Sequence, residues 1–236
     1  MSPTQRGAGS WHGFAIEGDM HTCWLCQRPV SAKALRCPSC GALQPLHETN
    51  HFALLGLEQR FDLDLETLDR HYASARRTLD PERVAVKTPK AGALAKQYIE
   101  LMAAAHETLR NPVTRARYLL GLLDAEARAR GDEPAAVVES PAANHNGLGH
   151  GSLSHDDLDD LARAIEEATD AAALDRLGGR AVGGIEGCIH SLSTAFRAGR
   201  VGEARLALAH LDRLEQLSAE ARQRRQTLCP PKKFDP

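Results

Sequence analysis

Two Cys-x-x-Cys pairs near the N-terminus, separated by ten residues, constrain this chain more than any other feature. They comprise Cys23, Cys26, Cys37 and Cys40. Two residues between paired cysteines let both thiolates of a tight turn face one ion, and Gly41 can adopt the positive φ that such a turn often needs. Two such turns complete a tetrahedral site of four sulfurs, which suits structural Zn²⁺ and leaves no open position for catalysis.

The metal is expected to supply most of the stability of residues 21–45, because so short a segment cannot fold on its own apolar burial. An iron site, redox thiols and a relic without metal are the alternatives that the pattern leaves open. Cys188 and Cys229 stand alone in the sequence. We expect one of them to pack in a helix and the other to lie in a tail.

Composition predicts an all-α fold for the rest of the chain. Hydrophobic residues make up 42% and aromatic residues 4%, and Val and Ile are sparse beside Ala, Leu, Arg and Glu, which are strong helix formers. The net charge of −2 argues against a dedicated nucleic-acid or membrane-surface protein. No apolar run could span a bilayer, and residues 1–20 contain neither a secretory signal nor a convincing transit peptide. We therefore expect the bacterial cytoplasm, with the mitochondrial matrix as the alternative.

Apolar residues step by three and four along several segments, which places them on one face of each predicted helix. The first long helix is expected over residues 65–79, with Asp64 as its N-cap and the residue before Pro81 as its end. The second spans the apolar positions from Leu94 to Leu109 and ends at Asn111, and a short helix follows over residues 113–123. Three more helices are predicted between residues 153 and 226, where glycines at 178–179 and 183–184 should weaken or bend the second of them.

These patterns divide the chain into successive segments. They are a flexible leader (1–20), a zinc module (21–45), a helical unit (50–123), a flexible linker rich in Ala, Gly, His, Asn and Pro (124–152), a C-terminal three-helix bundle (153–226) and a tail (227–236).

Several stretches of this chain resemble co-chaperones of the HscB type, which begin with a J-domain. The most specific is Ala-His-Glu-Thr-Leu-Arg-Asn-Pro over residues 105–112, followed by Arg-Ala-Arg-Tyr-Leu-Leu over 115–120. Residues 51–57, 61–64 and 208–214 also resemble that family, and some HscB proteins carry an N-terminal module of paired Cys-x-x-Cys motifs. The resemblance covers about residues 21–225 in the same order. It implies a J-domain helical hairpin and a C-terminal three-helix bundle behind a small zinc knuckle.

The resemblance implies a co-chaperone. HscB proteins use the J-domain to stimulate ATP hydrolysis by a DnaK-type chaperone such as HscA, and the bundle to deliver the iron–sulfur scaffold protein IscU. The chain would then be an adaptor that raises the effective concentration of one partner near the other.

The chaperone-binding surface departs from the family in one position that matters. Where the family reads His-Pro-Asp between its two long helices, this chain reads Asp80-Pro81-Glu82, so a carboxylate replaces the histidine. Part of the accompanying basic face is kept. By resemblance, the chaperone-binding residues are Arg70, Arg76, Arg77, Asp80, Pro81, Glu82 and Arg83, although the arginines could also form an ordinary solvated helix face.

The client-binding surface departs as well. The family uses an apolar and acidic stretch at the start of the first bundle helix and an aromatic residue on the last. The matching positions are Leu153, Asp157, Leu158 and His210, and the large apolar residues that dominate such interfaces are mostly absent.

Two versions of the co-chaperone hypothesis follow, together with two rival classes. The chain is either a working, divergent HscB-type protein or a J-like paralog that binds partners without stimulating ATPase activity. An enzyme is not expected, because no phosphate loop, nucleophile elbow or paired histidine–glutamate motif occurs. A nucleic-acid-binding zinc ribbon would need a basic patch, and only Arg222, Arg224 and Arg225 with Lys232 and Lys233 offer one.

Overall fold

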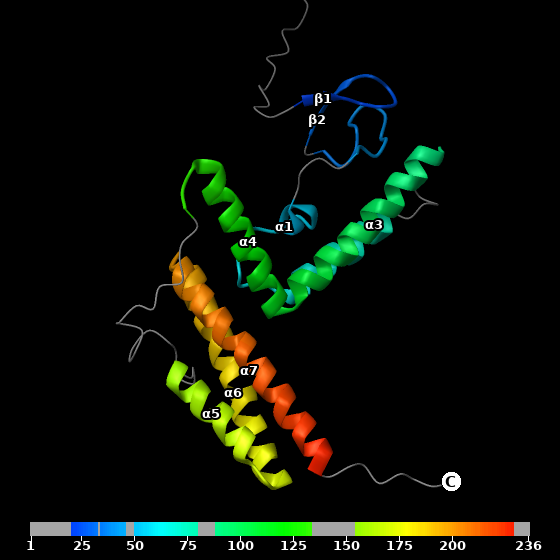
Figure 1. Cartoon of the computed structure of the whole chain (residues 1–236). Helices are drawn as coiled ribbons and strands as arrows, with labels where there is room; N and C mark the ends of the chain where they lie inside the picture. The colour runs from blue at the N-terminus through cyan, green and yellow to red at the C-terminus, as the bar shows by residue number, and fades with distance from the viewer. Residues whose placement is uncertain (1–19, 33, 46–49, 80–87, 134–153, 229–236) are drawn as a thin grey trace, which may run out of the picture. The chain divides into compact units, whose positions relative to one another are not determined.

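The computed structural model describes residues 20–32, 34–45, 50–79, 88–133 and 154–228, and these form helices apart from one small sheet (Figure 1). The elements in order are β1 Met20–Thr22, β2 Pro29–Ser31, α1 His51–Leu54, α2 Leu65–Leu79, α3 Pro89–Arg110, α4 Pro112–Arg130, α5 His155–Glu167, α6 Ala171–Arg197 and α7 Val201–Leu228. The predicted all-α class is confirmed. No helix in the described part is both long and apolar enough to cross a bilayer.

Two compact units divide the chain. The N-terminal unit combines the residues up to Asn50 with Arg76–Leu101, and the C-terminal unit combines His51–Ala75 with everything from Met102 onward. The end of the α2–α3 hairpin therefore groups with the cysteine module. Residues 1–19 of the predicted leader, 134–152 of the linker and 229–236 of the tail lie outside the described residues.

In the N-terminal unit, β1 and β2 pair antiparallel, with His21 opposite Val30. A small buried cluster of Cys23, Val30 and Cys37 forms the centre of the module, and Cys26, Ala34 and Cys40 pack against it. Four of these six residues are cysteines, and Ala42 and Leu43 are also fully buried in the module. That a metal supplies most of its stability stays a prediction.

Local capping explains where the long helices begin. Asp64 accepts hydrogen bonds from the backbone N–H of Glu66 and Thr67, which confirms it as the cap of α2. The Thr88 hydroxyl accepts from the Ala91 N–H at the start of α3. Asn111 caps α4 through the N–H groups of Val113 and Thr114.

An ion-pair cluster joins the early part of α2 to the late part of α3. The Asp69 carboxylate lies 2.6 Å from His106 Nε2 and 2.5 Å from Arg110 Nη1. The Tyr72 ring stacks on the His106 ring with centroids 4.3 Å apart. The two helices therefore run antiparallel here, as the resemblance implied. The hydrogen bond from His106 and then that from Arg110 lower the pKa of Asp69.

The predicted end of the fourth helix at residue 123 was wrong, because α4 continues to Arg130. Residues 124–130 have no apolar stripe, and we therefore assigned them to the linker. They are nevertheless good helix formers, Ala, Glu and Arg among them. The helix ends at Gly131, whose φ of 81° places it in the left-handed region and whose N–H bonds to the last turn.

The bundle consists of α5, α6 and α7. Ser154 and Asp157 form a reciprocal capping box at the start of α5. The buried positions of α6 and α7 include many small residues, such as Ala181, Gly184 and Gly187 on α6 and Ala204 and Ala207 on α7. The helix α6 is continuous through the glycines that we expected to weaken or bend it, because packing of its buried face can offset the weak helix propensity of glycine.

Three arginines form ion pairs that tie α4 and the segment before α2 to the bundle within the C-terminal unit. Arg205 of α7 bonds to Asp124 of α4, and their side chains are only 21% and 17% exposed. Arg117 of α4 bonds to Asp212 of α7. Arg197, at the end of α6, bonds to Asp62 in the segment before α2.

The first prediction concerns the most buried of these pairs. Arg205→Ala leaves Asp124 largely desolvated without its cation, so we expect the free energy of unfolding to fall by about 2 kcal/mol. The control is Arg200→Ala, which removes a more exposed pair with Glu203 and should cost under about 1 kcal/mol. Urea denaturation of both variants measures the difference. Equal losses would mean that the Arg205–Asp124 pair does not hold α4 to the bundle.

Candidate metal centre and partner surfaces

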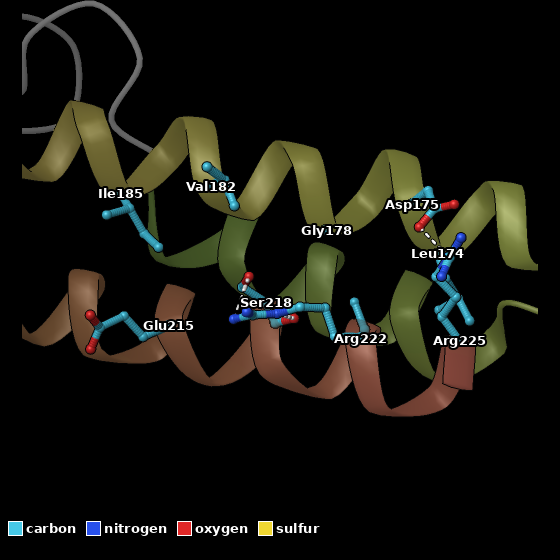
Figure 2. Close-up of a pocket in the computed structure, with 10 residues that line it drawn as sticks. Leu174, Asp175, Gly178, Val182, Ile185, Glu215, Ser218, Arg222 and Arg225 are labelled. Carbon is cyan, nitrogen blue, oxygen red and sulfur yellow. Dashed lines mark hydrogen bonds and ion pairs between the residues drawn. The ribbon is translucent and has the colours of Figure 1, made fainter. Parts of the chain in front are cut away.

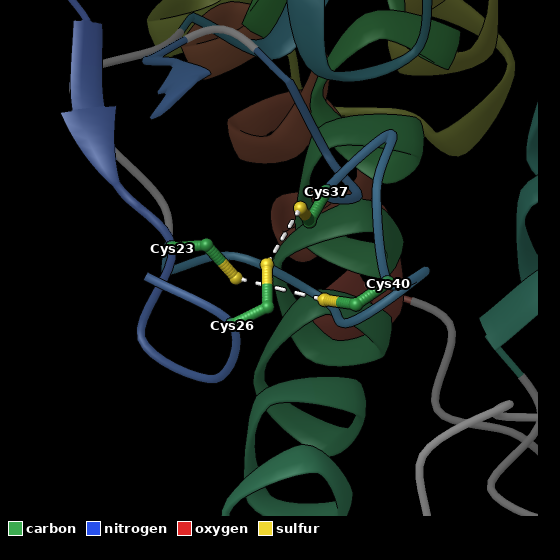
Figure 3. A group of neighbouring side chains, drawn as sticks. All are labelled: Cys23, Cys26, Cys37 and Cys40. Carbon is green, nitrogen blue, oxygen red and sulfur yellow. Dashed lines mark hydrogen bonds between the residues drawn. The ribbon is translucent and has the colours of Figure 1, made fainter. Parts of the chain in front are cut away.

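The four predicted cysteine ligands converge on one point (Figure 3). All four sulfur atoms lie within 4.8 Å of one another. The Sγ atoms of Cys23 and Cys40 are 3.7 Å apart, and those of Cys26 and Cys37 are 3.6 Å apart. None of the cysteines is in a disulfide. In the described part of the chain, no other cluster of three or more His, Cys, Asp or Glu side chains is close enough to share an ion.

This geometry fits a tetrahedral metal. Four sulfurs at about 2.3 Å from a Zn²⁺ ion are separated from one another by roughly 3.8 Å, close to the two shorter distances observed. The Leu25 N–H and the Gln44 side-chain amide also point at Cys23 Sγ, at 3.5 and 3.4 Å. Such donors stabilise a thiolate and orient it. The arrangement can hold one metal ion through four cysteine ligands.

The cysteine thiols differ in pKa. Burial raises the pKa of Cys23, but hydrogen bonds from the Cys26 and Leu25 backbone and from neighbouring thiols outweigh it and lower that pKa to about 6. For Cys40, the Ala42 N–H lowers the pKa, but burial and the three other thiols together raise it to about 12. Crowded thiols ionise one after another unless a cation compensates their charge, as expected at a metal site.

Both Cys-x-x-Cys turns are followed by a residue in the left-handed region. Gly41 has a φ of 74°, as predicted, and Gln27 occupies the equivalent place in the first turn with a φ of 60°. The two turns are therefore alike in backbone conformation, but only the second has the residue that adopts this conformation without strain. Sequence analysis missed Gln27 because its side chain gives no sign of an unusual backbone.

The predicted chaperone-binding residues fall into two groups. Arg70, Arg76 and Arg77 are exposed on α2. Arg70 and Arg77 are seven residues apart, so they share one helix face. The Arg70 guanidinium also donates to the Thr67 hydroxyl at 2.7 Å. Asp80, Pro81, Glu82 and Arg83 lie outside the described residues.

The predicted client-binding residues do not form one exposed patch. Leu158 is 2% exposed and belongs to the bundle core, and His210 is 7% exposed. The His210 ring lies 6.5 Å from that of His155. Asp157 is exposed but serves in the capping box, and Leu153 lies outside the described residues. The surface that α5 offers instead is acidic, because Asp156, Asp157, Asp159 and Asp160 are all exposed.

A groove of about 430 Å³ lies between α6 and α7, away from the predicted client-binding residues (Figure 2). Leu174 and Ala221 contribute apolar surface, and Gly178 leaves space between the helices. Asp175 and Arg225 form an ion pair of 2.6 Å across it. The groove is lined by charges of both signs, which gives no basis for assigning it a ligand.

Comparisons with known proteins agree with the resemblance seen in the sequence. The co-chaperone protein HscB homolog of Paraburkholderia phymatum is 34% identical over 93 residues, which are 38% of this chain and 53% of that protein. HscB of Proteus mirabilis is 37% identical over 73 residues, 31% of this chain and 42% of its own length. The predicted likeness to HscB co-chaperones is confirmed. The chain thus spans about half the length of the curated relatives it matches, and no protein-family model matches it.

Two solved HscB structures share the fold. Human HscB superposes with a TM-score of 0.65 over 88% of this chain and 100% of that one, at 20% sequence identity. HscB from Vibrio cholerae superposes with a TM-score of 0.51 over 76% of this chain and 99% of that one, also at 20% sequence identity. The likeness in fold therefore extends well beyond the segments that match in sequence.

The second prediction concerns the two left-handed turn residues. Gly41→Ala forces a Cβ into the left-handed region at a cost of roughly 1–2 kcal/mol, so zinc affinity should fall about tenfold. Gln27→Gly relieves the same strain in the first turn and should raise affinity, by less because glycine also loses more backbone entropy on folding. Competition with a chromophoric chelator measures both.

Ser39→Ala, at an exposed position in the second turn, is the matched control and should leave zinc affinity unchanged. The interpretation fails if Gly41→Ala binds zinc as tightly as this control.

Proposed function

We propose that this chain is a co-chaperone of iron–sulfur cluster assembly. It binds a DnaK-type, HscA-like chaperone through the α2–α3 hairpin and stimulates its ATPase, and it delivers an IscU-like scaffold protein through the bundle. The observation that carries the proposal is the combination of relatives named HscB at 34–37% identity with a fold that follows human HscB over its whole length. The named relatives are bacterial, which supports a place in the bacterial cytoplasm.

The described residues support an adaptor rather than a catalyst. The exposed arginines of α2 offer positive charge to a chaperone, and the exposed aspartates of α5 offer negative charge to a client. Charge of this kind speeds association and selects partners more than it adds affinity. The ion pairs around α4 hold the segment before α2 and the bundle together, so binding one partner brings the other near.

Zinc is the metal that the four-cysteine centre best supports. Cys23, Cys26, Cys37 and Cys40 would hold it as thiolates, and Gln44 would orient Cys23. Bound zinc supplies folding free energy and, with all four positions filled by protein, no Lewis-acid chemistry. We therefore assign this centre a structural role.

The third prediction tests the chaperone half of the proposal. We expect this protein to accelerate single-turnover ATP hydrolysis by its DnaK-type partner. Arg76→Ala/Arg77→Ala should reduce the stimulation about tenfold, about 1.4 kcal/mol of activation free energy, because the exposed cations steer and hold the complex. Arg128→Ala, which removes an exposed cation from α4, is the matched control and should act like the unmodified protein.

An Asp80→His/Glu82→Asp variant separates the two versions of the proposal. Stimulation by the unmodified protein means that Asp80-Pro81-Glu82 still works. Stimulation only by the restored loop identifies a J-like paralog that binds without triggering hydrolysis. If neither version stimulates, the likeness is one of fold alone and the co-chaperone proposal is wrong.

The fourth prediction tests the client half. Asp156→Asn/Asp159→Asn should weaken binding of the iron–sulfur scaffold protein at least ~threefold at low salt, mainly through slower association, because exposed interface charges act on the association rate. Glu186→Gln removes an exposed acid from α6 and should have no effect. Biolayer interferometry at two salt concentrations gives both rate constants. Equal affinities for the unmodified protein and both variants would show that α5 is not part of the client-binding surface.

A further inference from the structure

Three contacts connect the cysteine module to the end of the helical hairpin within the N-terminal unit. Each starts at, or next to, a cysteine ligand and ends on α2 or α3. None of them is required to assemble the four sulfurs. They therefore offer a path along which the state of the metal centre reaches the hairpin.

The first contact is made by Arg36, the residue before Cys37. One guanidinium nitrogen donates to the Gly41 carbonyl at 3.3 Å, at the end of the second Cys-x-x-Cys turn. Another donates to the Thr78 carbonyl at 2.8 Å, in the last turn of α2. The last carbonyls of a helix have no partner within the helix, and a cation placed there satisfies one and matches the helix dipole. Arg36 thus joins a metal-binding turn to the C-terminal end of α2.

The second contact runs from Cys23 to α3 through Gln44. The fully buried Gln44 side chain donates to Cys23 Sγ at 3.4 Å and to the Ala42 carbonyl at 2.8 Å. The backbone carbonyl of Gln44 accepts a hydrogen bond from the Tyr98 hydroxyl at 3.1 Å, and Tyr98 is only 3% exposed. A buried hydroxyl that loses its acceptor is costly, so Tyr98 depends on the position of Gln44.

The third contact involves Trp24, between Cys23 and Cys26. Its indole N–H donates to the Leu43 carbonyl at 2.6 Å, which fixes the ring over the second half of the module. The Lys90 ammonium, in the first turn of α3, lies 4.6 Å from the ring centroid. This is a cation–π contact.

We infer that metal occupancy of the four-cysteine centre controls the order of the hairpin end, the last turn of α2 and the N-terminal half of α3, with Arg36 as the positioning residue for α2. Without a metal the described part of the module has only Val30, Ala34, Ala42 and Leu43 besides its thiols as apolar core, too few to keep its fold. Arg36, Gln44 and Trp24 then lose the positions from which they hold the hairpin. Removing the metal therefore loosens helices that contain none of its ligands.

This inference has a consequence that rests on the proposed function. Arg76 and Arg77 occupy the same last turn of α2 that Arg36 holds at Thr78. Metal content would then regulate chaperone docking as well as the stability of the module.

Hydrogen–deuterium exchange of the full-length protein tests the inference without any partner. Chelating the metal should speed exchange about tenfold or more in peptides covering Arg76–Leu79 and Pro89–Tyr98, while exchange in α6 and α7 stays the same. In metal-loaded Arg36→Ala, exchange should rise in the end of α2 alone, with one metal ion still bound per chain. Arg36→Lys, which keeps the cation, should restore part of the protection.

Arg28→Ala is the matched control, because Arg28 is an exposed arginine of the same module. Tyr98→Phe changes no residue of the module itself but removes the hydroxyl bonded to the Gln44 backbone carbonyl, and should loosen α3 with the metal in place. Chelation that leaves hairpin exchange unchanged would overturn the inference, as would Arg36→Ala behaving like Arg28→Ala. These outcomes do not depend on ATPase stimulation, so the proposed function can fail while the inference holds.

Discussion

The convergence of four cysteine sulfurs is the constraint on which the N-terminal unit depends. The sulfurs lie within 4.8 Å of one another, and Cys23 and Cys37 are buried at the centre of the module. On the inference that this centre holds a metal, metal binding and folding are a coupled event for this segment. Because Arg36 and Gln44 reach from the module to α2 and α3, the end of the hairpin depends on that event too.

The C-terminal unit is stabilised by helix packing and ion pairs. Its helices α6 and α7 pack through small buried residues such as Ala181 and Ala207, where close backbone approach brings many weak dispersion contacts. Ion pairs such as Arg205–Asp124 join α4 to this packing. The helices α2 and α3 are divided between the two units. On our inference, loss of the metal therefore loosens the end of the hairpin that belongs to the N-terminal unit. The other end stays held by Asp69 and its partners.

Most local features were predicted from the sequence, and the long-range contacts were not. Cysteine spacing predicted the four-cysteine cluster, and apolar residues spaced three and four apart predicted the long helices. Asp64 was correctly identified as a cap. The extension of α4 to Arg130 was missed because polar helix formers have no periodic stripe. The bond from Arg36 to Thr78 spans 42 residues, and no local pattern shows which arginine meets which helix end. Leu158 matched a family client position in sequence, but sequence does not show that it turns into the bundle core.

Segregated charge explains how a nearly neutral chain can act between two unlike partners. The net charge is only −2, but the exposed face of α2 carries Arg70 and Arg77 whereas α5 begins with four exposed aspartates. Under the proposed function, each face would attract a partner of opposite charge and repel the partner of the other face, which is a source of specificity. The replacement of a histidine by Asp80 adds a carboxylate three residues after Arg77. A chaperone that accepts this loop must therefore present less negative charge, or more positive charge, than one that reads His-Pro-Asp.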